Sequence, residues 1–397
     1  MMRADLPPVI VLGGESNALS IARRLGTMGV RVYGIGVAPF VEQSRHLRPI
    51  PLPPGLRTAD QESAWPELLL GRATDHLQGA VVLAASDAGI SVLARNRARL
   101  LDRFLLDVSD TSVQLDMLDK LATYRSAVEA GVPTPRFWRI DGPEDLDRYR
   151  DELVFPLIVK PLHSHTYQAA FPGLSKFRVA EDIDRLMAEH GELTEAGLAV
   201  MLVEKIEGPD DLLCSYYTYI DDTGASTFDF TKRIVRRHPP NMGIATYHVT
   251  DWNPEVRDVA LRLFKHVGLR GVANAEFKRD RRDGVLKLIE CNARFTAANC
   301  LLAAAGIDLA RHVYHQVIGR SYPLPSQYRT GLRLLYPTND LRAFRMLRGA
   351  GELSAGEWLR SLAHPQTFPY MDLRDPKPAV VRGLHRVRRA AAQVRGG

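Results

Sequence analysis

The chain has 397 residues, 45% of them hydrophobic, which is enough for two or three domains with filled cores. No apolar run reaches the roughly 18 residues of a membrane span, and the start lacks a secretory apolar segment. Three scattered cysteines without a C-x-x-C pair predict a cytoplasmic protein with neither a disulfide framework nor a zinc framework. The formal charge of +6 equals the six cations after Pro376, so the remaining chain is neutral overall and a nucleic-acid-binding body is disfavoured.

The first 110 residues carry the pattern of a parallel sheet. Residues 9–12 predict a buried strand, residues 18–25 a helix, and residues 30–35 and 80–84 two further strands. A strand, a helix and a strand within about 30 residues form a βαβ unit, whose strands are parallel. The turn at Gly13-Gly14 lacks the G-x-G-x-x-G spacing and the following acidic residue, so a nicotinamide or flavin site is disfavoured.

From about residue 110 the pattern changes to mixed helices and short strands. A helix ends at Gly131, and residues 157–161 predict an apolar strand that contains Lys160. Residues 199–206 predict a second apolar strand that becomes polar at its end. Asn253 and Gly268 bracket a further helix as its N-cap and C-cap.

Two alternating segments, residues 273–278 and 288–294, flank the turn dipeptide Asp283-Gly284 and predict a β-hairpin. Alternation places polar side chains on one face of each strand: Asn274, Glu276 and Lys278 on the first, and Glu290, Asn292 and Arg294 on the second. Carboxylate and amide oxygens are ligands that suit Mg²⁺. The alternative is a solvated sheet face with a salt bridge, and the hairpin alone favours neither.

The metal prediction requires Glu276 to lie directly opposite Glu290. A two-residue turn would oppose Glu276 to Cys291 and separate the carboxylates onto different faces. We therefore expect a three-residue loop, Arg282 to Gly284, with Gly284 in the left-handed region.

Residues 231–240 form the most cationic segment inside the predicted domains. On a regular strand, Lys232, Ile234 and Arg236 face one way, and Arg233, Val235 and Arg237 face the other. A basic edge strand and a substrate-facing strand are equally compatible with this pattern.

The tail after Pro376 predicts a basic amphipathic helix. Apolar residues recur at helical spacing: Val380, Leu384, Val387 and Val394. A packed helix with a solvated basic face is favoured over a helix that docks on a membrane or an anion.

The order of these segments resembles the ATP-grasp superfamily, in particular carboxylate–amine ligases related to D-aspartate ligases. The resemblance covers roughly residues 8–320 and rests on five motifs in order. These motifs are Gly13-Gly14 with Ser44-Arg45-His46, Asp119-Lys120 with Ala130 to Pro135, Phe155 to Pro161, Val203 to Gly208, and Glu276 with Glu290-Cys291-Asn292-Ala293-Arg294. It implies an α/β protein in which a pre-ATP-grasp parallel-sheet domain (1–110) precedes a two-lobed ATP-grasp α+β domain (111–200 and 201–325). Residues 326–397 would be a C-terminal extension.

The resemblance also implies a role for each candidate residue. Lys120 and Lys160 would hold the ATP phosphates. Glu204, Lys205 and Ile206 would bind adenine, and Asp210 or Asp211 would reach the ribose. Glu276, Glu290 and Asn292 would hold Mg²⁺, with Mn²⁺ as an alternative. Arg294 would stabilise the transferring phosphoryl group, and Lys232 would lie over the acylphosphate or an acidic substrate.

The implied activity is an ATP- and Mg²⁺-dependent ligase that joins a small carboxylate to an amine through an acylphosphate. A phosphotransferase that stops at a phosphorylated product is the alternative. A non-catalytic nucleotide-binding protein is disfavoured by the intact set Glu276, Glu290, Asn292 and Arg294. The substrates would be small molecules, and a homodimer is left open. One departure from the family concerns residues 163–173, which hold one glycine where many members carry a glycine-rich loop.

Overall fold

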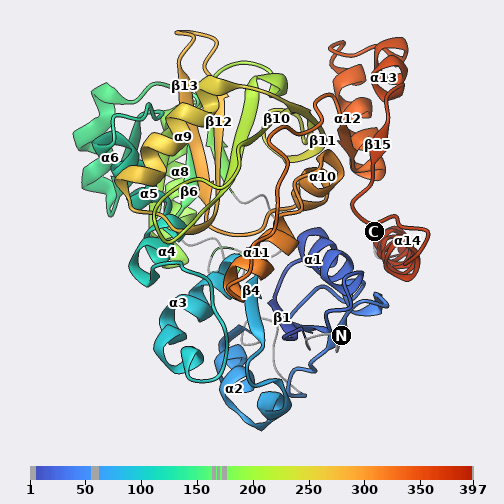
Figure 1. Cartoon of the computed structure of the whole chain (residues 1–397). Helices are drawn as coiled ribbons and strands as arrows, with labels where there is room; N and C mark the ends of the chain where they lie inside the picture. Colours follow the sequence, from blue (N-terminus) through green and yellow to red (C-terminus); the bar gives the residue numbers. More distant parts are fainter. Residues whose placement is uncertain (1–5, 55–61, 163–166, 168–169, 172–176, 396–397) are drawn as a thin grey trace.

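The N-terminal part is a parallel sheet flanked by helices, as the βαβ pattern predicts (Figure 1). The computed structural model describes residues 6–54, 62–162, 167, 170, 171 and 177–395. The strand order is β3-β2-β1-β4, and every pairing in this sheet is parallel. The strands are β1 (Val9–Leu12), β2 (Val32–Ile35), β3 (Arg48–Pro49) and β4 (Val81–Ala84). The helices are α1 (Ser16–Gly26), α2 (Trp65–Leu70) and α3 (Asp87–Leu101).

A four-stranded antiparallel sheet of order β5-β8-β6-β7 follows. Its strands are β5 (Phe137–Ile140), β6 (Leu157–Pro161), β7 (Arg178–Ala180) and β8 (Val200–Glu204). The helices of this region are α4 (Thr111–Leu118), α5 (Lys120–Glu129), α6 (Pro143–Tyr149) and α8 (Ile183–Glu195). Leu186 and Leu193 of α8 pack with Leu157 and Val159 of β6 in one apolar core.

A seven-stranded sheet of order β13-β12-β9-β10-β11-β14-β15 carries the predicted hairpin. Its strands are β9 (Leu213–Ile220), β10 (Phe230–His238), β11 (Ile244–Asp251), β12 (Gly271–Arg279), β13 (Leu286–Asn292), β14 (Arg333–Leu335) and β15 (Gln366–Thr367). Helix α9 (Pro254–His266) covers one face, where Leu263 and Phe264 share a core with Ala273 and Phe277. Asn253 caps this helix as predicted, because its side chain accepts a hydrogen bond from Val256 N–H at 3.2 Å.

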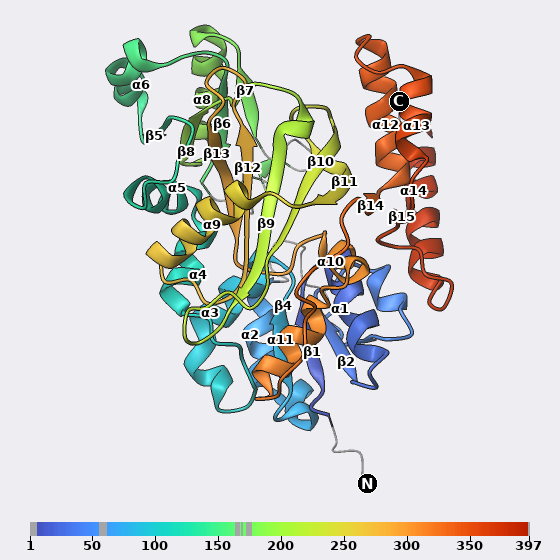
Figure 2. The ribbon, with the colours of Figure 1, turned by 45° about the horizontal axis from the view of Figure 1, so that its top comes forward.

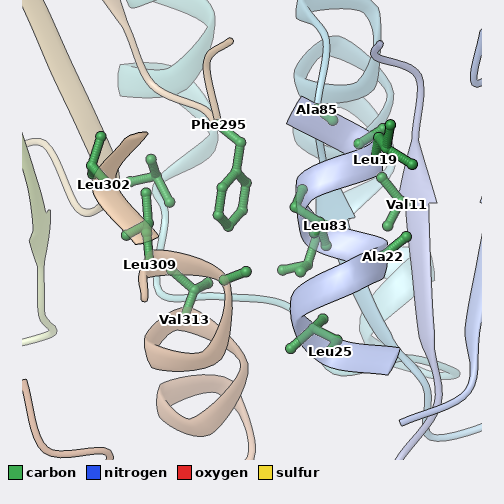
Figure 3. Packing of buried hydrophobic residues seen from close by; sticks show 14 of the residues in the cluster. Val11, Leu19, Ala22, Leu25, Leu83, Ala85, Phe295, Leu302, Leu309 and Val313 are labelled. Carbon is green, nitrogen blue, oxygen red and sulfur yellow. The ribbon is translucent and has the colours of Figure 1, made fainter. Parts of the chain in front are cut away.

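The N-terminal domain packs on the seven-stranded sheet's lobe through helices. Leu19 and Leu25 of α1 belong to the same buried apolar cluster as Leu302 and Val313, which lie on α10 (Asn299–Ala305) and α11 (Leu309–Val317) (Figure 3). The Asn17 side chain donates to the carbonyl of Phe295 at 3.0 Å. The junction therefore brings the start of α1 next to the chain that leaves β13.

The C-terminal segment adds both strands and helices to this lobe. Besides β14 and β15 it contains α12 (Pro337–Gly349), α13 (Ala355–Leu362) and α14 (Lys377–Arg395). Figure 2 shows α14 along the edge of the molecule, and Arg386 of this helix contacts the start of α12. Short 3₁₀ turns lie at Val41–Gln43, Glu62–Ala64, Arg72–Leu77, Arg150–Glu152 and Asp210–Leu212. Across the described helices, none combines the length and the apolar character needed to span a membrane.

Candidate active site

Four residues on adjacent strands form one row across the seven-stranded sheet. Lys232 of β10 lies opposite Ser215 of β9, Ser215 lies opposite Glu276 of β12, and Glu276 lies opposite Glu290 of β13. Directly opposed residues of antiparallel strands point to the same face. The expected alignment of Glu276 with Glu290 is thus confirmed, and Lys232 stands on the same face.

A β-bulge, and not the expected loop, produces this alignment. Near the turn Arg279 pairs with Leu286, and the register shifts by one residue between Phe277 and Glu276, which leaves Ile289 as the extra residue. The three-residue loop was wrong, because the Asp280 N–H closes the turn on the Val285 carbonyl. Gly284 does have a left-handed φ of 70°. The bulge is held from α5, since the Tyr124 hydroxyl donates to the Ile289 carbonyl at 2.9 Å.

The two carboxylates suit a divalent cation. Burial raises the pKa of Glu276, and the nearby Glu290 carboxylate raises it further, while Lys232, Arg237 and Arg294 act against this. Asn292 belongs to the same group, because its side-chain amide donates to Glu290 Oε1 at 3.2 Å. A cation held by these oxygens would relieve the repulsion between the carboxylates.

The donor set matches the way in which Mg²⁺ is bound in proteins. No group of three or more His, Cys, Asp or Glu side chains forms a metal site within the described part of the chain. Two carboxylates and an amide oxygen leave coordination positions for water and substrate phosphates, which Mg²⁺ usually retains. The arrangement thus fits a metal shared with a nucleotide better than a closed structural site.

Of the predicted lysines, Lys232 belongs to this carboxylate row and Lys160 lies near Glu290 at its other end. Lys232 is 2% exposed, and its ammonium group donates to Ser215 Oγ at 3.0 Å. The Lys160 ammonium lies 3.5 Å from the Tyr124 hydroxyl. Burial lowers the pKa of Lys160, and the negative charge of Glu290 partly restores it, so this lysine faces the carboxylates.

Lys120 is the first residue of α5 and is half-buried. It lies one helical turn before Tyr124, and residues four apart share one side of a helix. Tyr124 contacts both Lys160 and β13. The side of α5 that carries Lys120 therefore faces Lys160 and β13 as well.

Arg294 connects the hairpin to the N-terminal domain. Its Nε donates to Asp87 Oδ1 at 2.5 Å, across 207 positions of sequence. Burial acts to lower the pKa of Arg294, but the carboxylates of Asp87, Glu290 and Glu276 outweigh it and raise the pKa. The sequence analysis missed Asp87 as a site residue, and no local signal identifies a partner so distant in the chain. Its neighbour Ser86 caps α3, accepting from Gly89 N–H at 3.0 Å.

The predicted adenine segment, Glu204 to Ile206, is tied to the hairpin by two cations that the sequence analysis did not assign. Arg282 makes an ion pair with Glu204 at 2.9 Å and donates to the Lys205 carbonyl at 3.3 Å. Lys278 donates to the Ile206 carbonyl at 3.0 Å. Burial, together with the charge of Arg237, lowers the pKa of Lys278 to about 8.

The two ribose candidates differ in their surroundings. Asp210 is buried and accepts hydrogen bonds from the Arg237 side chain at 2.7 Å and from the backbone N–H of Arg237 and Asn241. Asp211 is exposed. Since the Asp210 carboxylate is already engaged, Asp211 is the better candidate for a ribose contact.

The predicted alternation of β10 is wrong beyond Ile234. Register shifts on both sides of Arg236 break the pattern. Arg236 points to the face covered by α12, where it pairs with Asp340 at 2.8 Å. Arg237 instead pairs with Asp210 beside the adenine segment. The predicted phosphate loop, residues 163–173, lies almost wholly outside the described residues, including both of its histidines.

Among known proteins, the chain is similar in sequence to two ligases. No protein-family model matches the chain. It is 22% identical over 318 residues to a D-aspartate ligase of Enterococcus faecium, covering 77% of this chain and 75% of that protein. It is 28% identical over 209 residues to a D-alanine–D-alanine ligase of Methylococcus capsulatus, covering 50% of this chain and 64% of that protein.

Solved structures share the fold at low identity. An ADP complex of N5-carboxyaminoimidazole ribonucleotide synthetase has a TM-score of 0.62 at 14% identity, covering 84% of this chain and 82% of that one. An L-amino acid ligase from Bacillus licheniformis has a TM-score of 0.58 at 17% identity, covering 78% and 74%. The chain is thus similar in sequence to two ligases and similar in fold to ATP-grasp proteins. The ATP-grasp fold predicted from the order of motifs is confirmed, and the relatives support the predicted class, an ATP-dependent carbon–nitrogen ligase.

Proposed function

We propose that this protein is an ATP- and Mg²⁺-dependent ligase that joins a small carboxylate to an amine through an acylphosphate. The observation that carries the proposal is the single row of Lys232, Ser215, Glu276 and Glu290 on one sheet face. Asn292 and Arg294 flank this row at the end of β13.

In the first step a carboxylate oxygen of the acid attacks the γ-phosphorus of ATP, the bond to the bridging oxygen breaks, and ADP leaves. Lys160 and Lys120 would neutralise the nucleotide phosphates, and Lys232 would lie beside the transferring phosphoryl group. Glu276, Glu290 and Asn292 would hold the Mg²⁺, which supplies charge stabilisation between the phosphates.

In the second step the amine attacks the acyl carbon, the amine loses a proton, and phosphate leaves from the tetrahedral intermediate. Arg294 would stabilise the oxyanion of that intermediate, since its guanidinium lies near the carboxylate pair. Asp87 orients Arg294 from the N-terminal domain, so the domain junction would take part in positioning it.

The test is a screen of acid–amine pairs for release of ADP and phosphate, with the product identified by mass spectrometry. We expect both releases to require acid and amine together, in a ratio of one ADP and one phosphate per amide. A stable phosphorylated product that persists when amine is supplied would favour the phosphotransferase instead. Glu290→Gln serves as the inactive control.

A further inference from the structure

The attached side of helix α14 carries Arg382 and Arg386, together with Ala379 and Val381, which pack against the apolar core. The Arg382 guanidinium lies 3.7 Å from the centre of the Tyr370 ring. Arg386 donates to Thr338 Oγ1 at 2.6 Å and to Asn339 Oδ1 at 2.9 Å, at the start of α12. These contacts turn the arginine-bearing side of α14 toward the protein.

One row of apolar residues on α14 points to solvent. Val380, Leu384 and Val387 are 58%, 53% and 67% exposed, and their spacing of four and three residues places them in one row, the α14 stripe. Leu373, just before the helix, is 99% exposed. Single exposed apolar residues are ordinary, but three of them in one row on a helix form an unpartnered face.

The charges beside the α14 stripe indicate what covers it. After Asp375 the chain contains no acidic residue. Lys377 precedes Val380 by three residues and Arg388 follows Leu384 by four, so both exposed cations flank the stripe. A second copy of α14 packed on this face would bring these cations close to their own counterparts, and like charges repel. An anionic surface complements them.

We propose that α14 docks the protein on an anionic phospholipid surface. Val380, Leu384 and Val387 enter the interfacial region of the bilayer, and Lys377 and Arg388 contact the head groups, as in amphipathic helices that lie in the membrane plane. Figures 1 and 2 show α14 at the edge of the molecule, where a flat surface can approach it. The interaction does not involve the carboxylate row and is independent of the proposed ligase activity.

The test is co-sedimentation of the full chain with vesicles. We expect binding to vesicles of phosphatidylcholine with phosphatidylglycerol, weakened by salt, and at least about tenfold weaker binding to phosphatidylcholine alone. The triple variant Val380→Gln, Leu384→Gln, Val387→Gln should lose at least about tenfold in affinity. Each of Lys377→Gln and Arg388→Gln should lose about fivefold, since one cation near an anionic surface contributes about that factor. Leu359→Gln, at an equally exposed leucine of α13, is the matched control and should bind like the unaltered protein.

Circular dichroism checks that the stripe variant remains folded, which its exposed positions predict. Absence of binding to the anionic vesicles, or binding that the stripe variant does not weaken, would overturn the proposal. Light scattering without vesicles measures the oligomeric state of the unaltered protein and of the stripe variant. A dimer that the stripe variant dissociates would assign the face to a second copy of the chain.

Discussion

Apolar residues recur with a clear period in the sequences of both the hairpin β12–β13 and helix α14. The two elements differ in whether these apolar residues are buried or exposed. In the hairpin, Glu276 and Glu290 share a face as predicted, and that face carries the candidate chemistry. In α14 the residues Val380, Leu384 and Val387 share a face as predicted, but all three are exposed. Periodicity therefore predicts which residues lie together and does not decide which side of an element is buried.

The difference in burial follows from the chemistry of the surface against which each element packs. Helix α9 provides an apolar surface for the opposite face of the hairpin, where Ala275 and Phe277 are buried. The surface under α14 instead provides the Tyr370 ring and the side-chain oxygens of Thr338 and Asn339. These groups accept guanidinium groups better than valine and leucine.

The strongest way to test the hairpin side of this comparison is to remove one carboxylate. Glu290→Gln should lower turnover by at least about 10³-fold, because the site would lose several kcal/mol of charge stabilisation and each 1.4 kcal/mol is a factor of ten. The melting temperature should change little, since Glu290 is exposed. Asp283→Asn, at the hairpin tip, is the matched control. Full turnover in folded Glu290→Gln would show that this face of the hairpin is a solvated surface and not a metal site.

The neighbouring residues Arg236 and Arg237 of β10 pair with different carboxylates, so their substitutions should have different effects. Arg236→Ala should lower the free energy of unfolding by about 3 kcal/mol, because it leaves the buried Asp340 carboxylate without its cation. The KM for ATP should stay unchanged. Arg237→Ala should raise that KM, since Arg237 holds Asp210 beside the adenine segment. Urea unfolding and initial-rate kinetics measure the two effects. A raised KM for ATP in folded Arg236→Ala would contradict the observed orientation.

A smaller effect concerns the pH dependence of stability at Lys278. Its pKa is lowered to about 8 in the folded protein from a usual value near 10.5. Between these values the folded protein binds fewer protons than the unfolded chain, so stability rises with pH across this window. The free energy of unfolding of the unaltered protein should therefore gain about 2–3 kcal/mol over that of Lys278→Met from pH 8 to pH 10.5, at about 1.4 kcal/mol per pH unit. A flat or falling difference between the two proteins would show that Lys278 titrates normally.

The sequence predicts the elements well because they depend on local patterns. The hairpin alternation, the Asn253 cap and the order of motifs all lie in short segments. The bulge at Ile289 could not be predicted, because it depends on the hydroxyl of Tyr124, 165 positions away in the chain. For the same reason the contact of Asp87 with Arg294 appears only once the domains are packed.

The most direct test of the account is to follow the oxygen of the acid substrate. The acid that the screen identifies is labelled with ¹⁸O in its carboxylate and incubated with the protein, ATP, Mg²⁺ and the amine. Transfer through an acylphosphate moves one carboxylate oxygen to phosphate, so ³¹P NMR should show one ¹⁸O in each inorganic phosphate released. Amide formation with unlabelled phosphate would contradict the proposed mechanism.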